Sequence, residues 1–339
     1  MTSNSRGRRA LVAPSTMLAA AGALIYAGVL VAPASAGNPA TFGFNGGRNV
    51  LNAPSVGYPP PGNIYAPFTD CPLNDPVLNQ SVSGLATGCL SSTATSGSFA
   101  IRGIPVPITH PVTVQLGFYS LIDSAGNQIF PSVPPLDGRE LVDQPEATPG
   151  GLPVLLLCPN GINADIAALC QKAATSGHTE LTALVRPAGL ISNFNPVAAL
   201  VPGTPTFTLP VKIQLINPLL GGNCYIGSDD DPIVLNPAFS VPGTLSFTPD
   251  PDPTEFPNVV VISATGSTLT DTSFSVPVAN GCGPGGVADA AIDFLLGLPS
   301  PSGANELVLS NSDSFLADSF GTSDQIDVLK DAFKESSGS

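Results

Sequence analysis

Short apolar runs that alternate with polar or small residues are the feature that most restricts the fold of this chain. They recur beyond residue 98, with turn residues between them every eight to twelve positions. This spacing is typical of antiparallel sandwiches and barrels rather than of alternating β/α units. The sequence therefore predicts a mainly β fold, an antiparallel β-sandwich with a few short helices. The expected strands are residues 99–108, 112–122, 151–158, 179–185, 206–216, 232–235, 243–247, 259–264 and 273–278.

The first two of these runs are expected to form a hairpin that turns at His110 and Pro111. Residues 91–98, rich in Ser, Thr and Gly, are interpreted as the segment that leads into it. Apolar residues that recur on one face predict three short helices. These helices are expected at residues 163–174, 287–296 and 324–334.

The amino-terminal segment has the pattern of a secretory signal peptide. A basic start with Arg6, Arg8 and Arg9 precedes an uncharged apolar run over residues 17–31, and Ala34-Ser35-Ala36 follows. Small residues at these places fit a signal peptidase that cleaves after Ala36. An uncleaved anchor is the alternative, but the apolar run is shorter than the ~20 residues of a spanning helix. We therefore expect a secreted, extracellular protein without a membrane span after cleavage.

Cleavage would leave 8 basic residues against 25 acidic residues, a formal charge of −17. A field of this sign repels phosphate backbones and anionic lipid surfaces. The sequence has no basic cluster after Arg9 that would reverse the field locally. Nucleic-acid binding is therefore excluded as an expected function, and a protein of the envelope or extracellular space remains the possible partner.

Six cysteines lie beyond the signal segment, and an even number in an exported chain predicts three disulfides. Fifteen connectivities are possible. Sequential pairing closes the shortest loops and is the preferred one. Zinc ligation is disfavoured, because no C-x-x-C occurs and neither histidine has a ligand-like spacing from a cysteine. The preferred pairs are Cys71 with Cys89, Cys158 with Cys170, and Cys224 with Cys282.

The part of the chain beyond residue 36 exceeds the usual size of one domain, so two subdomains are expected. Residues 37–98 are interpreted as a Pro/Gly-rich lead-in that holds the first cysteine pair. Residues 99–190 then form a β-rich subdomain. Residues 191–339 form a second one with carboxyl-terminal helices.

No catalytic constellation is evident. The chain lacks a G-x-S-x-G motif, and its only candidate bases are His110, before a proline, and His178, after an expected helix. A glycosidase is disfavoured because the chain has no Trp and only five Tyr. Glu140, Asp143 and Glu146 are interpreted as a solvated loop. We expect no catalytic residue, no cofactor and no enzymatic activity.

One acidic cluster could hold calcium. Asp229, Asp230 and Asp231 are consecutive, and Asp250, Asp252 and Glu255 follow. Calcium takes six to eight oxygen ligands, but this spacing matches no known calcium loop, and three consecutive side chains of an extended chain cannot point at one ion. A solvated turn is the preferred interpretation, and the three aspartates stay weak metal candidates.

The carboxyl-terminal third contains a set of short motifs, namely N-P-L-L-G from Asn217, C-Y-I-G-S from Cys224, D-x-S-F-x-x-P from Asp271, G-C-G around Cys282 and L-G-L-P-S from Leu296. In this combination they resemble a group of exported actinobacterial proteins of unassigned function. The resemblance implies secretion and a bridge from Cys224 to Cys282. The run of aspartates after C-Y-I-G-S is more acidic than the group's usual continuation, so calcium binding gains no support from it.

Together these features predict an exported, non-enzymatic structural or interaction protein. Two alternatives stay open. One is an extracellular hydrolase whose site is assembled from distant segments. The other is a secreted module that binds an apolar ligand or calcium, because apolar residues make up 43% of the chain and charged residues only 11%. A deep apolar cavity would favour the apolar ligand, and a filled core would contradict it.

Overall fold

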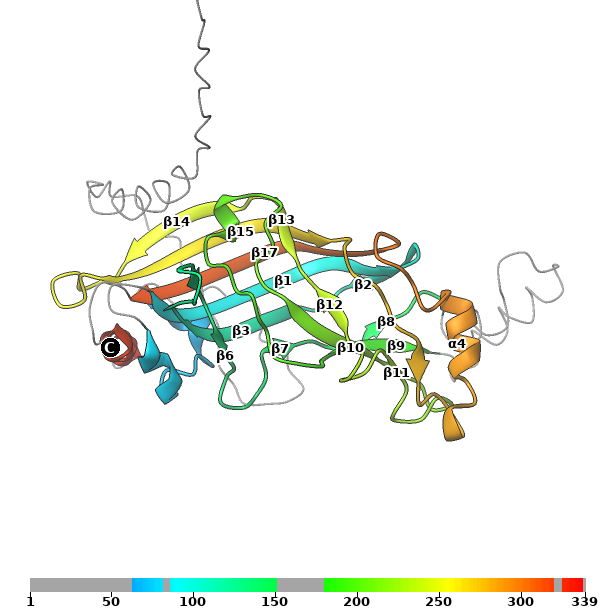
Figure 1. The fold of residues 1–339 in the computed structure, drawn as a ribbon. Helices are drawn as coiled ribbons and strands as arrows, with labels where there is room; N and C mark the ends of the chain where they lie inside the picture. The colour runs from blue at the N-terminus through cyan, green and yellow to red at the C-terminus, as the bar shows by residue number, and fades with distance from the viewer. Residues whose placement is uncertain (1–62, 82–85, 151–179, 320–324, 338–339) are drawn as a thin grey trace, which may run out of the picture. The chain divides into compact units, whose positions relative to one another are not determined.

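The computed structural model describes residues 63–81, 86–150, 180–319 and 325–337 (Figure 1). The predicted signal segment, the strand at 151–158, the helix at 163–174 and three predicted site residues lie outside these ranges. Those residues are Cys158, Cys170 and His178. Within the described ranges, no helix is long and apolar enough to cross a membrane.

Two antiparallel sheets form the core of the fold, which confirms the prediction of a mainly β protein. The larger sheet has the order β13-β15-β17-β1-β3-β6, and β14, β2 and β7 pair with β15, β1 and β3 respectively. Its long central strands lie side by side in Figure 1. Its strands are β1 (Thr87–Ile101), β2 (Ile104–Ile108), β3 (Val112–Tyr119), β6 (Ser132–Val133), β7 (Leu141–Val142), β13 (Ala238–Val241), β14 (Thr244–Pro249), β15 (Val259–Asp271) and β17 (Asn305–Ser319).

The smaller sheet has the order β16-β11-β10-β9-β8, with β12 paired to β10. A separate two-stranded sheet joins β4 (Leu121–Ile122) to β5 (Gln128–Ile129). The expected strand at 273–278 is reduced to a single bridge between Val276 and Ser300. The strands of the smaller sheet are β8 (Glu146–Ala147), β9 (Thr182–Pro187), β10 (Leu209–Ile216), β11 (Tyr225–Ile226), β12 (Ile233–Leu235) and β16 (Ala279–Asn280).

Helices are short and lie outside the sheets. Two of the expected helices are present as α4 (Asp289–Leu296) and α5 (Gln325–Ser337). Gly297 ends α4 in the left-handed conformation, where its missing side chain avoids a clash. Four short 3₁₀ helices complete the described elements, namely η1 (Ala66–Phe68), η2 (Pro76–Gln80), η3 (Ala198–Leu200) and η4 (Pro284–Gly286).

The first hairpin turns at Arg102 and Gly103, so the prediction of a turn at His110 and Pro111 was wrong. Both turn residues have positive φ, as a two-residue turn of type I′ requires. Strands β2 and β3 then pair in succession with the same strand, β1. The segment around His110 is thus a short interruption between two collinear strands.

Hydroxyl side chains hold the middle of the larger sheet together. Ser92 faces Ser314 on β17 with 2.8 Å between their oxygens, and Thr93 faces Thr113 on β3 at 3.0 Å. The half-buried serine pair and the buried threonine pair are thereby hydrogen bonded across strands. This explains why residues 91–98 form part of a 15-residue strand and not a lead-in.

The two faces of the larger sheet are covered differently. One face packs against the smaller sheet, and buried residues of both sheets form one apolar cluster. The other face packs against η1, η2 and α5 in a second cluster. We call these the cavity face and the packed face. A disulfide between Cys71 and Cys89 ties the lead-in to β1 on the packed face.

The predicted subdomains share these sheets. Strand β1 begins before residue 98 and continues past residue 99, and it pairs with β17 from the carboxyl-terminal part of the chain. On the small sheet, β9 precedes residue 190 and pairs with β10, which follows it. Strands from both sides of the expected boundary at residues 190 and 191 therefore build the same two sheets.

Candidate ligand-binding cavity between the two sheets

An apolar cavity of about 120 Å³ lies between the two sheets. Apolar side chains from β1, β2 and β3 line it on the larger sheet, and apolar side chains from β9 and β10 line it on the smaller one. The polar residues in the described lining are Asp143, Glu146 and Thr148. The apolar lining includes Phe99, Ile101, Ile104, Val106, Val114, Leu209, Ile213, Leu215, Leu307 and Leu309.

The alternation of the strands explains why these side chains converge. In β10, alternate residues from Leu209 to Leu215 are buried, because successive side chains of a strand point to opposite faces. In β2, Ile104, Val106 and Ile108 line the cavity, while Pro105 and Pro107 point outward. Proline lacks an N–H donor, so it suits a strand at the edge of a sheet. The edge strand β2 therefore contributes side chains to the cavity wall.

One side of the cavity is bordered by the segment that passes from β7 in the larger sheet to β8 in the smaller one. Glu146 on β8 is 5% exposed, and its Oε1 accepts hydrogen bonds from the backbone N–H groups of Thr109 and His110, each at 2.7 Å. Its Oε2 accepts from the Thr109 hydroxyl at 2.6 Å and lies 3.2 Å from His110 Nδ1. Glu146 thus links the smaller sheet by hydrogen bonds to the segment between β2 and β3.

Asp143 lies in the same segment and lines the cavity. Its Oδ2 accepts a hydrogen bond from the backbone N–H of Val185 at 3.0 Å. Burial raises its pKa to about 6, and the nearby charge of Glu146 adds to the rise, while His110 opposes it. Thr148 completes the polar lining and donates its hydroxyl to the Leu181 carbonyl at 2.8 Å.

The interpretation of Glu140, Asp143 and Glu146 as a solvated loop was therefore wrong. Glu140 is 2% exposed, and burial raises the pKa of its carboxyl group. Its Oε2 accepts the backbone N–H of Ile191 at 2.9 Å. In each case a carboxylate satisfies backbone donors that would otherwise be buried without a partner.

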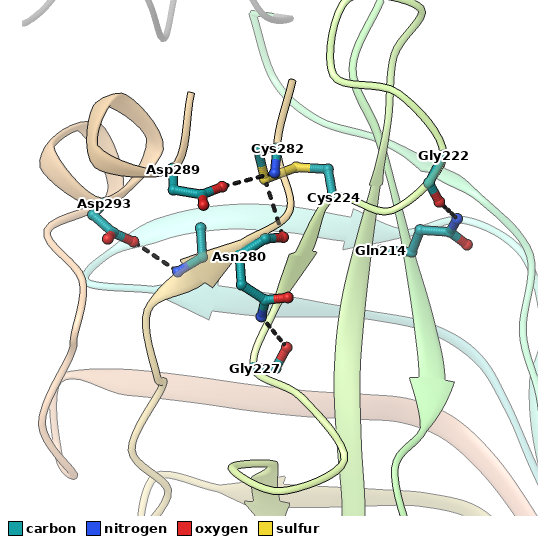
Figure 2. Close-up of a disulfide and its surroundings, with 9 residues drawn as sticks. Gln214, Gly222, Cys224, Gly227, Asn280, Cys282, Asp289 and Asp293 are labelled. Carbon is teal, nitrogen blue, oxygen red and sulfur yellow. Dashed lines mark hydrogen bonds between the residues drawn. A yellow bond between two sulfur atoms is a disulfide. The ribbon is translucent and has the colours of Figure 1, made fainter. Parts of the chain in front are cut away.

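Helix α4 borders another part of the cavity through Leu296. Figure 2 shows how the helix is held: Asp289 and Asp293 accept the backbone N–H groups of Cys282 and Ala279, each at 2.7 Å. Cys282 is bonded to Cys224, as expected from the sequence. The disulfide and the two carboxylates together fix the helix that places Leu296.

The aspartate cluster forms an exposed turn. Ser228 and Asp231 close the turn through their backbone and hydroxyl groups, and Asp229 pairs with Lys212 at 2.6 Å. Among the other acids proposed for calcium, Asp250 accepts the Tyr65 hydroxyl, and Asp252 accepts backbone N–H groups of its own turn. No group of three or more potential metal ligands converges in the described part of the chain.

His110 does not have the geometry of a hydrolytic base. The Glu146 carboxylate and the Thr109 hydroxyl both lie next to the same ring nitrogen, Nδ1. The Thr109 hydroxyl donates its proton to Glu146. A triad requires the acid on one ring nitrogen and the nucleophile on the other. Among the described residues, no hydroxyl is hydrogen bonded to Nε2 of His110.

Comparisons with protein families, with curated proteins and with solved structures find no match to this chain. The function must therefore be argued from the cavity. The sequence raised an apolar ligand as an alternative without assigning residues to it. Alternation along β2 and β10 could have indicated which side chains point inward, but not that a space remains between them.

Proposed function

We propose that this chain is an exported, non-enzymatic protein that binds an apolar ligand between its two sheets. The observation that carries the proposal is the cavity of about 120 Å³, whose described lining is apolar except for Asp143, Glu146 and Thr148. Protein interiors are normally packed without voids larger than a water molecule. A dry apolar cavity of roughly 150 Å³ is known to bind a small apolar molecule.

The signal pattern, the two disulfides and the absence of a spanning helix in the described ranges support export. A purely structural or interaction role, the first expectation from the sequence, would not require a space between the sheets. The hydrolase alternative is less favoured, because no hydroxyl among the described residues is hydrogen bonded to Nε2 of His110. Binding without catalysis is the function that the geometry supports best.

The test is binding of a small fluorescent apolar probe, indole, to the purified full chain, which contains no Trp that would mask the indole signal. We expect saturable binding that an unlabelled alkyl alcohol displaces. Ala183 lines the cavity, so Ala183→Phe should fill the space and weaken binding at least tenfold. Ala147→Phe is the matched control, because Ala147 is exposed on the neighbouring strand β8 and faces away from the cavity. Equal binding by both variants, or no saturable binding by the unaltered chain, would contradict the proposal.

A further inference from the structure

A second, smaller cavity of about 60 Å³ lies on the same face of the larger sheet. We call the cavity already described the first chamber and this one the second chamber. The second chamber is lined by Leu90 and Ser92 on β1, by Phe239 and Leu269, and by Ala199 near η3. It is also apolar for the most part, with a few hydroxyl and amide groups.

The two chambers lie next to each other on the larger sheet. Val114 lines the first chamber and pairs in register with Ser92, which lines the second. Leu309 and Leu269 are a second register pair of this kind. Directly paired residues of adjacent antiparallel strands have Cβ atoms only about 5 Å apart. Residues that line the two chambers are therefore direct neighbours at two separate strand pairs.

Phe207 lines both chambers. Its side chain is 5% exposed, and it belongs to the apolar cluster between the sheets. The residues that follow it in the chain, from Leu209, line the first chamber, while Thr206 before it lines the second. Phe207 thus lies between the two chambers.

The charges around the chambers restrict the chemistry of a ligand. Asp143 and Glu146 line the first chamber, and no Lys, Arg or His belongs to the described lining of either one. An anionic head group would be placed near carboxylates in a medium of low dielectric constant, which is unfavourable. A hydroxyl head group has no such cost and can donate a hydrogen bond to a carboxylate.

We propose that the two chambers form one binding site, divided by Phe207, for a linear and uncharged apolar chain such as a medium-chain alcohol. This inference rests on the proposed function, since it specifies the ligand of the same site. A linear chain fits because each chamber alone is small and residues that line the two chambers are paired on neighbouring strands. The site then selects by chain length and by the charge of the head group.

The experiment measures dissociation constants for a series of linear alcohols of increasing length by displacement of the same probe. Affinity should rise by about fourfold for each methylene buried. Ala199 lines only the second chamber, so Ala199→Phe should leave short alcohols unaffected and weaken long ones at least tenfold. Phe207→Ala should tighten the binding of long alcohols about tenfold.

Phe99→Ala is the matched control for Phe207→Ala. Phe99 is also buried but lines only the first chamber, so its truncation enlarges the space without joining the chambers. If Phe207→Ala does not fold, Ala199→Phe and the unaltered chain still decide the question. An unchanged length profile in Ala199→Phe would overturn the two-chamber site while leaving ligand binding intact.

The head group is tested with an alcohol and a carboxylic acid of the same length at pH 7.5. We expect the alcohol to bind at least tenfold more tightly. Equal binding, or preference for the acid, would overturn the proposed selectivity. Absence of displacement by every compound, together with absence of probe binding, would instead count against the proposed function itself.

Discussion

The cavity face and the packed face belong to the same larger sheet, yet they are filled in different ways. On the packed face, Tyr65 and Phe333 stack with ring centroids 4.4 Å apart, and Leu329 of α5 is fully buried. On the cavity face, inward-pointing side chains of two sheets leave a space between them. A helix can shift until it packs closely on one sheet, whereas the side chains of two facing sheets are held in position by the strand pairs within each sheet. We therefore expect substitutions on the packed face to change stability alone, and substitutions on the cavity face to change the proposed ligand binding as well.

The largest expected effect comes from truncating matched leucines on the two faces. Leu329→Ala should lower the free energy of unfolding by about 3–4 kcal/mol, because it creates a new cavity in a closely packed cluster. Leu307→Ala should cost about 1 kcal/mol less, because Leu307 already borders empty space and loses fewer contacts. Urea denaturation of both variants measures the difference. A larger loss for Leu307→Ala would contradict the division between the two faces.

The disulfide on the packed face offers a second test. The bridge from Cys71 to Cys89 joins residues 18 positions apart, so replacing both with Ser should lower the free energy of unfolding by about 3 kcal/mol. The cavity lies on the opposite face, so probe affinity measured below the unfolding transition should stay within about twofold. Thermal melting and probe titration of the same preparation provide the two readings. A parallel loss of binding would show that the faces are not independent.

The smallest expected effect is a pH dependence at the rim of the cavity. The pKa of Asp143 is raised to about 6 in the folded chain, above its ordinary value of 3.8, so between these values the folded state holds more protons than the unfolded one. Its contribution therefore favours folding at low pH and is lost as the pH rises from about 4 to 6. The full rise corresponds to about 3 kcal/mol, and solvent screening of the half-buried side chain reduces this to about 2 kcal/mol. Because Asn does not titrate, the free energy of unfolding of Asp143→Asn should lack this part of the pH dependence. Urea denaturation of the variant and of the unaltered chain at pH 4, 5, 6 and 7 measures it. The same pH dependence in both chains would contradict a raised pKa of Asp143.

The fold class could be predicted from the sequence, because alternation and turn residues are local signals. The observed bounds of strands such as β10 agree closely with these signals. The 15-residue strand β17 was missed because its middle part is rich in Ser, Asn and Asp, and most of β1 was missed because its middle part holds Ser, Thr and Gly without large apolar residues. Gly, Asn and Asp have low strand preference by themselves. They become strand residues here because Ser92 and Ser314 satisfy each other, and only the pairing of distant segments provides this.

The candidate site shows the same limit. By itself the sequence determined the alternation that points Leu209, Ile213 and Leu215 inward, the acidic charge and the even number of cysteines. Only the tertiary structure decided that the inward side chains leave two chambers, that Phe207 lines both, and that Glu146 is buried and Asp143 half-buried beside the first chamber. The alternation of apolar residues along a strand indicates which face of the sheet each side chain points to. The space left over depends on the distance and register of two sheets, which are set by contacts between residues far apart in the chain.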